Sequence, residues 1–246
     1  MNKPSAIVTG ASSGIGKAVA DRLLALGYHV TALARWSDGL PPPGEGLHPV
    51  MIDLANQGGI RAVIEPLLRD LPEGLDALVN AAGFGRFDPH RSIDPDAIAA
   101  MTAVNLTAPM ILSRLCLPAL EEKQGKILNI ASVTARHLGK RGAAYAGAKA
   151  GLLHFGRNLF EEVRKSGVSV CTLLPDLTDT PFYDTLDFAP TAGADTALGV
   201  DFVANAAEHI LTAPPGSVIE EITLRPQRLR IEKCSSKLRR PAPTAE

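Results

Sequence analysis

The sequence predicts an α/β fold in which one domain is built on a three-layer, doubly wound parallel sheet. Three observations support this prediction. Short apolar runs alternate with longer helical patterns along most of the 246 residues, and parallel strands need helical crossovers of this kind. A glycine-rich turn separates the first strand from the first helix. The chain is 46% hydrophobic and 21% charged, which is ordinary for a globular protein.

The expected elements follow one another in a regular order. The apolar runs predict strands at residues 5–9, 28–34, 50–52, 75–80, 126–131, 168–174 and 218–224. The helical patterns predict helices that end near residue 26 or cover residues 57–69, 95–122, 143–165 and 200–212. Gly27 is expected to end the first helix as its C-cap. A turn-rich loop over 175–193 is expected to be mobile.

Charge is distributed unevenly along the chain. Residues 1–224 carry 18 lysines and arginines against 24 acidic residues, whereas residues 225–246 carry seven against two. The acidic body argues against nucleic acid as a partner. We expect one domain over residues 1–225 and a basic extension over 226–246 that is solvated or disordered.

Composition also narrows the compartment and the metal chemistry. No run of 18 apolar residues occurs and a strand-like run begins at Ser5, so we expect a cytoplasmic protein without a membrane span. The three cysteines are odd in number and far apart, which favours reduced thiols. The six histidines are not at metal-ligand spacing, so no metal site is expected.

The glycine turn has the character of a phosphate-binding loop. It runs Thr-Gly-Ala-Ser-Ser-Gly-Ile-Gly over residues 9–16. Glycines let the backbone turn sharply and let a phosphate approach the free N–H groups of a helix N-terminus, although such turns also occur for structural reasons alone. The expected contacts to a dinucleotide are Gly10, Ser12, Ser13, Gly14, Ile15 and Gly16.

A candidate acid–base group lies in the second half of the chain. Tyr145 and Lys149 are four residues apart and share one helix face. The lysine charge and the cationic ring of a bound dinucleotide together favour the phenolate, so we expect the pKa of Tyr145 to fall towards working pH, where it can exchange a proton with an alcohol or carbonyl. Ser132 can orient the same oxygen. Pro109 lacks an N–H and frees the carbonyl of Asn105 to hold a water, although it also kinks helices without any function.

In their order along the chain, these segments resemble the short-chain dehydrogenase/reductase family in its compact form. The matching positions over residues 5–225 are the glycine turn, Asn80-Ala-Ala-Gly83, Asn105, Ser132, Tyr145-Ala-Gly-Ala-Lys149, Pro175 and Thr180. The resemblance implies a Rossmann-like catalytic domain that binds NAD(P). It also implies hydride transfer between a secondary alcohol and a ketone or aldehyde, with Asn105, Ser132, Tyr145 and Lys149 as the catalytic residues.

The resemblance implies further cofactor contacts after the third, fourth and sixth strands. They are Asp53, Leu54, Asn80, Ala81, Ala82, Gly83, Pro175, Thr178 and Thr180, together with Tyr145 and Lys149. Three positions depart from the family pattern. Ala81 stands where many members have a second asparagine, and Thr178 where an apolar residue is usual. Asp176 replaces a glycine, and either contacts the substrate or caps the loop.

Cofactor choice depends on the end of the second strand, Leu33-Ala34-Arg35. The resemblance implies that an NAD-dependent member places an acidic residue at position 34 to bind the ribose hydroxyls. Ala34 cannot do this, and the Arg35 guanidinium offers donors suited to a phosphate dianion. We expect NADP(H), with NAD(H) less favoured; alternatively, Arg35 only faces solvent.

The expected substrate is a small carbonyl compound or alcohol. Five of the eleven aromatic residues fall near the site mouth, where they either bind an apolar substrate or pack the loop: Phe84, Phe87, Phe182, Tyr183 and Phe188. The mouth also includes the segment Thr134–Leu138. Arg136, His137 and Arg141 either recognise a carboxylate or form a solvated basic loop.

Further expectations concern the oligomeric state of the protein and two alternative functions. The family commonly pairs its two long helices, which implies a homodimer or homotetramer here. A non-catalytic dinucleotide-binding or sensor protein on the same fold is the main alternative function. An epimerase or dehydratase of the extended type is a second, against which the short chain argues.

Overall fold

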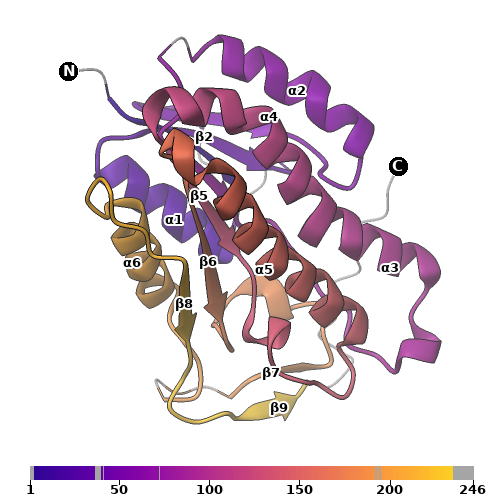
Figure 1. Ribbon diagram of the computed structural model, residues 1–246. Coiled ribbons are helices and arrows are strands. Elements are labelled where there is room, and N and C mark those ends of the chain that lie inside the picture. The colour runs from indigo at the N-terminus through magenta and orange to yellow at the C-terminus, as the bar shows by residue number, and fades with distance from the viewer. Residues whose placement is uncertain are drawn as a thin grey trace.

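A computed structural model describes residues 3–36, 40, 42–71, 73–191, 193 and 195–234. Its centre is a seven-stranded parallel sheet in the order β3-β2-β1-β4-β5-β6-β8 (Figure 1). The sheet strands are β1 Ser5–Thr9, β2 His29–Ala34, β3 Leu47–Met51, β4 Ala77–Asn80, β5 Lys126–Ile130, β6 Ser169–Pro175 and β8 Glu221–Leu224. The strand order reverses between β1 and β4, and ligands of doubly wound sheets bind at such a reversal.

Helices cover both faces of the sheet, so the predicted three-layer, single-domain fold is confirmed. They are α1 Gly14–Ala25, α2 Gln57–Arg69, α3 Pro95–Thr102, α4 Ala108–Lys123, α5 Ala143–Val163 and α6 Val200–Leu211. Helices α1 and α6 pack on one face, and α2, α4 and α5 on the other. Gly27 follows α1 with φ +86°, as expected of a glycine beyond a helix end.

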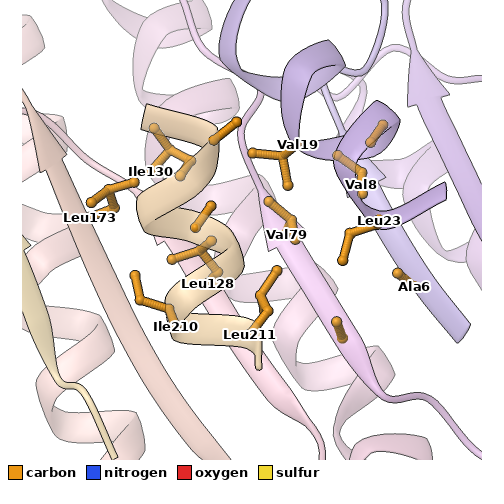
Figure 2. Packing of buried hydrophobic residues seen from close by; sticks show 14 of the residues in the cluster. Ala6, Val8, Val19, Leu23, Val79, Leu128, Ile130, Leu173, Ile210 and Leu211 are labelled. Carbon is orange, nitrogen blue, oxygen red and sulfur yellow. The ribbon is translucent and has the colours of Figure 1, made fainter. Parts of the chain in front are cut away.

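Alternation along the strands divides the core into two layers. Successive strand residues point to opposite faces. Ala6 and Val8 therefore lie in the layer under α1 and α6, whereas Ile7 lies in the layer under α2 and α4. Figure 2 shows the first layer, where Val79 and Leu128 of the sheet meet the two helices. Apolar burial on both faces holds the carboxyl edge of the sheet in a fixed position.

The helix expected over 95–122 contains a wider turn. A π-helical segment, Ala103–Thr107, joins α3 to α4, and the Ala108 N–H bonds to the carbonyl of Ala103. In the described part of the chain, the joined helix Pro95–Lys123 is the one segment that is long and apolar enough to cross a membrane by length and composition alone. Its α4 part packs into the second core layer, as a core helix of a globular domain does.

The end of the chain requires a correction to the expected boundary at residue 225. Residues 231–233 form β9 (Ile231–Lys233), which pairs antiparallel with β7 (Phe188–Pro190). The turn-rich loop expected to be mobile thus contains a strand and a short 3₁₀ helix, Pro181–Tyr183. Figure 1 shows this pair beyond the carboxyl ends of β6 and β8. The extension therefore belongs to the fold as far as Cys234, and residues 235–246 lie outside the described part.

Candidate active site

The glycine turn bends so sharply and packs so closely that residues with side chains cannot replace its glycines. Gly10 and Gly14 have φ values of +67° and +53°. A Cβ on Gly10 would lie 2.8 Å from the Cα of Ala82, and one on Gly16 would lie 2.3 Å from the carbonyl oxygen of Gly10. Helix α1 starts at Gly14 without a side-chain cap. Its first N–H groups therefore remain available to an anion.

Thr9 is a site-forming residue that the sequence reasoning missed. Its hydroxyl accepts hydrogen bonds from the N–H groups of Ala81 and Ala82, each at 3.0 Å, and donates to the carbonyl of Val79 at 3.4 Å. These bonds fix the start of the Asn80–Gly83 segment against the glycine turn. The signal was its place at the end of β1, directly before the first glycine.

The end of β2 presents a cation at the same edge. Ala34 is buried, whereas Arg35 is exposed, with its Cζ 5.4 Å from the ring centroid of Trp36. The N–H of Ile52 bonds to the carbonyl of Ala34, which brings the end of β3 alongside. Next along the chain, Asp53 is exposed and accepts one hydrogen bond from the N–H of Ala55, and Leu54 is buried. Arg35 and Asp53 thus follow neighbouring strands.

The predicted acid–base group is assembled from two segments. Tyr145 and Lys149 lie on α5 with 7% and 4% of their surface exposed, and Ser132, after β5, is 8% exposed. The Lys149 ammonium donates to the carbonyl of Ile130 at 2.8 Å and lies 5.8 Å from the centroid of the Tyr145 ring. The Ser132 hydroxyl accepts from the Thr134 hydroxyl at 3.0 Å and hydrogen-bonds with the Tyr145 oxygen.

The expected fall in the pKa of Tyr145 requires the cationic ring of a dinucleotide as well as Lys149, and in the protein by itself the pKa shifts in the opposite direction. Burial raises this pKa well above its usual range, and the hydrogen bond from Ser132 lowers it only in part. Burial also lowers the pKa of Lys149 to about 7, which weakens its support for a phenolate. Tyr145 is therefore held as a neutral phenol, the form that donates a proton.

Asn105 lies at the centre of the π-helical turn and is fully buried. Its amide nitrogen donates to the carbonyls of Phe84 and Met101, at 2.8 and 2.9 Å. Its amide oxygen is buried without a partner among the described residues. A Cβ on Gly83 would lie 2.6 Å from that oxygen and 3.3 Å from the Lys149 nitrogen. Only a residue without a side chain can therefore pack against these two polar groups at position 83.

The segment that follows β6 lies against the glycine turn. Pro175 ends β6, and the buried Thr178 donates to the carbonyl of Asp176 at 2.9 Å. Thr180 caps the 3₁₀ helix, and its side chain lies 3.3 Å from the Cβ position of Gly14. A surface groove of about 540 Å³ opens beside Gly14 and Asp179. Residues far apart in sequence therefore meet at one edge.

Both carboxylate oxygens of Asp176 have protein partners, which supports the second of the two expected alternatives, a cap of the loop. One carboxylate oxygen accepts from the N–H of Leu177, and the other pairs with the Arg225 Nε at 2.9 Å. The side chain of Asp176 is only 8% exposed. Both oxygens thus have protein partners, and a direct contact with substrate is not needed to explain the residue.

Aromatic rings surround the phenol of Tyr145. The Phe87 and Phe182 centroids lie 5.1 and 5.8 Å from the Tyr145 centroid, and Tyr183 and Phe188 extend the group. Phe84 packs against the same cluster. The rings contact both one another and Tyr145, so they pack the loop and also border the predicted acid–base group.

The basic residues of the mouth already have acidic partners, with one exception. Arg141 pairs with Asp88 and Asp187, each at 3.1 Å. Arg136 pairs with Glu221. His137 is exposed. The carboxylate-binding interpretation thus loses two of its three residues, since paired guanidinium groups are not free for a substrate anion.

The glycine turn at the strand-order reversal is typical of a dinucleotide-binding protein, and the structure brings the predicted tyrosine–lysine pair to the same edge of the sheet. Comparison with known protein families points to the same class of protein. Residues 4–188 match the family described as short chain dehydrogenase. The chain belongs to this family and is an oxidoreductase of the short-chain dehydrogenase/reductase type.

Individual relatives cover most of the chain. It is 30% identical to an uncharacterized oxidoreductase of Staphylococcus haemolyticus over 92% of this chain and 98% of that protein. It is 34% identical to a 3-oxoacyl-(acyl-carrier-protein) reductase of Salmonella typhimurium over 76% and 79%. An alcohol dehydrogenase of Thermococcus sibiricus, complexed with 5-hydroxy-NADP, superposes with a TM-score of 0.84 at 25% identity, over 93% and 99% of the chains.

Other solved structures differ in their cofactors. A metagenomic short-chain oxidoreductase in complex with NADP has a TM-score of 0.76 at 31% identity, over 91% of this chain and 97% of that one. A 4-hydroxyisoleucine dehydrogenase complexed with NADH and succinate has a TM-score of 0.80 at 25% identity, over 90% and 97%. Both dinucleotides thus occur among the structural relatives.

Proposed function

We propose that the protein is an NADP(H)-dependent oxidoreductase that interconverts a secondary alcohol and a ketone or aldehyde. The observation that carries this proposal is the convergence of Ser132, Tyr145 and Lys149 beside the glycine turn. The site fits a dinucleotide on two counts. The turn leaves N–H groups without a side-chain cap at the start of α1, and a Cβ cannot be accommodated at Gly10.

The residues have separate tasks in the proposed reaction. When bound, the nicotinamide dinucleotide supplies or accepts the hydride. In the reduction, the neutral phenol of Tyr145 donates its proton to the carbonyl oxygen, and the Ser132 hydroxyl hydrogen-bonds with that oxygen. Lys149, held by the carbonyl of Ile130, stabilises the phenolate that remains. In the oxidation, the same phenolate accepts the proton of the alcohol.

The chemistry of the mouth favours a neutral, apolar substituent on the substrate. The rings of Phe87, Phe182 and Phe188 present apolar surface near Tyr145. The arginines of the mouth are neutralised by acidic partners. An aryl alkyl ketone without a carboxylate fits this surface, because burying an unpaired carboxylate there costs free energy.

The preference for NADP(H) rests on the end of β2. Ala34 places no carboxylate beside the adenosine ribose, and the exposed guanidinium of Arg35 can bind a 2′-phosphate. Its stacking on Trp36 restrains the side chain near the edge of the sheet.

Turnover distinguishes this proposal from a non-catalytic sensor. Oxidation of NADPH is followed by its absorbance with a panel of neutral aryl alkyl ketones and with matched keto acids. We expect turnover of the neutral ketones and weaker turnover of the keto acids. Tight NADPH binding without oxidation for any carbonyl compound would support the sensor instead.

A further inference from the structure

The segment after β8 lies across the loop that carries the aromatic rings. We call residues 225–234 the C-terminal strap and residues 176–191 the lid loop. Strand β9 of the strap pairs with β7 of the lid loop in the register Phe188↔Lys233, Ala189↔Glu232 and Pro190↔Ile231. Hydrogen bonds extend this ladder at both ends, from the Thr191 N–H to the Arg230 carbonyl and from the Cys234 N–H to the Asp187 carbonyl.

Ion pairs between the strap and acidic residues reinforce the backbone hydrogen bonds. The basic strap meets acidic partners, because Arg225 pairs with Asp176 at 2.9 Å and Arg228 with Asp195 at 3.3 Å. The Arg228 N–H also donates to the carbonyl of Asp195 at 2.8 Å. Asp176 is nearly buried, so its charge depends on Arg225 and on the N–H of Leu177 for compensation.

Two aromatic residues of the lid loop, Phe188 and Tyr183, belong to the group of rings around Tyr145. Phe188 is the first residue of β7, and its centroid lies 5.3 Å from that of Phe87, which in turn contacts Tyr145. The centroid of Tyr183 lies 5.9 Å from that of Phe188. The charge of Asp176 reaches Tyr183, whose pKa burial and this charge raise to about 12. Tyr183 therefore stays a neutral phenol beside the site.

We propose that Arg225 and Asp176 are positioning residues that, together with β9, hold Phe188 and through its ring contact Tyr183 in place to bind the substrate's apolar group. This inference rests on the proposed function for the identity of the substrate. The contacts between the strap and the lid loop do not depend on it.

Point variants of the full chain test the positioning role by kinetics. In Arg225→Ala, we expect the KM for an aryl alkyl ketone to rise about tenfold, the size of effect that a lost apolar contact has on selectivity. The affinity for NADPH should fall by less than this, because only Thr178 and Thr180 of the expected cofactor contacts lie in the lid loop, whereas those in the glycine turn and at the end of β2 lie outside both segments. Arg225→Lys recovers part of the loss, and Asp176→Asn repeats it without adding to Arg225→Ala in the double variant.

The matched control is Arg22→Ala. Arg22 is also partly exposed and pairs over a long sequence distance with a carboxylate, Glu208, but it lies in the last turn of α1 and its partner lies on α6. We expect its KM to match that of the unmodified protein. An Arg225→Ala variant with an unchanged KM, or with a change equal to that of Arg22→Ala, would overturn the proposal. Equal losses of ketone and NADPH affinity would also overturn it.

Hydrogen exchange supplies a readout that needs no turnover. The N–H groups of Thr191 and Cys234 bridge the lid loop and the strap. In Arg225→Ala we expect them to exchange faster, whereas the amides of β6 keep their protection. Unchanged exchange at Thr191 and Cys234 overturns the positioning role. If no carbonyl compound is turned over, the proposed function fails, and this measurement still decides whether Arg225 holds the lid loop.

Discussion

Replacing Arg35 by alanine tests how the protein selects its cofactor. The change removes the guanidinium at the end of β2 and leaves the buried Ala34 and the strand itself intact. We expect the affinity for NADPH to fall about tenfold. The affinity for NADH stays within about twofold, because NADH has no 2′-phosphate for Arg35 to bind.

The magnitude follows from the surroundings of the side chain. A hydrogen bond between charged groups contributes about 1.5–3 kcal/mol, which corresponds to roughly 10–150-fold in affinity. Arg35 is exposed, so solvent screening favours the lower end of this range. Its contact with Trp36 at 5.4 Å partly orders the guanidinium before the phosphate binds.

Fluorescence and calorimetry give independent assays. Trp36 is the single tryptophan of the chain and lies beside Arg35, so its emission should report binding at this edge. Calorimetric titration gives the same dissociation constants for variants in which the emission itself changes. The unmodified protein should bind NADPH at least about tenfold more tightly than NADH, and Ala34→Asp with Arg35→Ala should reverse the order.

The exposed Arg61 on α2 gives a matched control, since Arg61→Ala removes an equal charge away from the site. We expect it to leave both affinities unchanged. Equal affinities of the unmodified protein for the two cofactors would refute the reasoning, and so would a parallel loss of both in Arg35→Ala. In either case Arg35 does not bind the 2′-phosphate.

Four further outcomes follow from the site and the fold. Tyr145→Phe keeps the ring but removes the proton donor, so kcat should fall about 10²–10⁴-fold with NADPH affinity retained; a kcat within about threefold would contradict the assignment. Because burial raises the pKa of Tyr145, alcohol oxidation should speed up from pH 7 to 10 while carbonyl reduction does not, and pH–rate profiles in both directions check this. Burial lowers the pKa of Lys149 to about 7, so this residue makes the unfolded chain bind more protons and raises stability from pH 7 to about 8.5, below the range in which the buried thiols of Cys116 and Cys171 act in the opposite direction; urea unfolding of Lys149→Met should lack this gain, and equal pH slopes over this range would count against it. Light scattering should show a homodimer or homotetramer, at two or four times the 25.9 kDa chain mass, because the long apolar helix leaves part of its surface outside the core; a single-chain mass at micromolar concentration would exclude it.

Local patterns in the sequence were sufficient to predict the strands of the large sheet, the tyrosine–lysine pair and the glycine turn. The runs of apolar residues predicted every strand of the large sheet, because alternation and crossover length are local properties. The four-residue spacing of Tyr145 and Lys149 placed both on one helix face for the same reason. Glycine spacing located the turn, since the required backbone angles at Gly10 and Gly14 exclude most other residues.

Only the tertiary structure decided features that depend on distant partners. The hydroxyl of Thr9 acquires its role from N–H groups more than seventy residues away in the chain. The Asp176–Arg225 pair and the β7–β9 ladder join a segment expected to be a mobile loop to one expected to be a solvated or disordered extension. In the protein by itself the pKa of Tyr145 is raised, because burial depends on the whole surrounding fold and outweighs the effect of one neighbouring lysine; the expected fall also requires the cationic ring of the cofactor. Sequence spacing thus determined which groups share an element, whereas packing decided which groups meet, what charge they carry and what covers them.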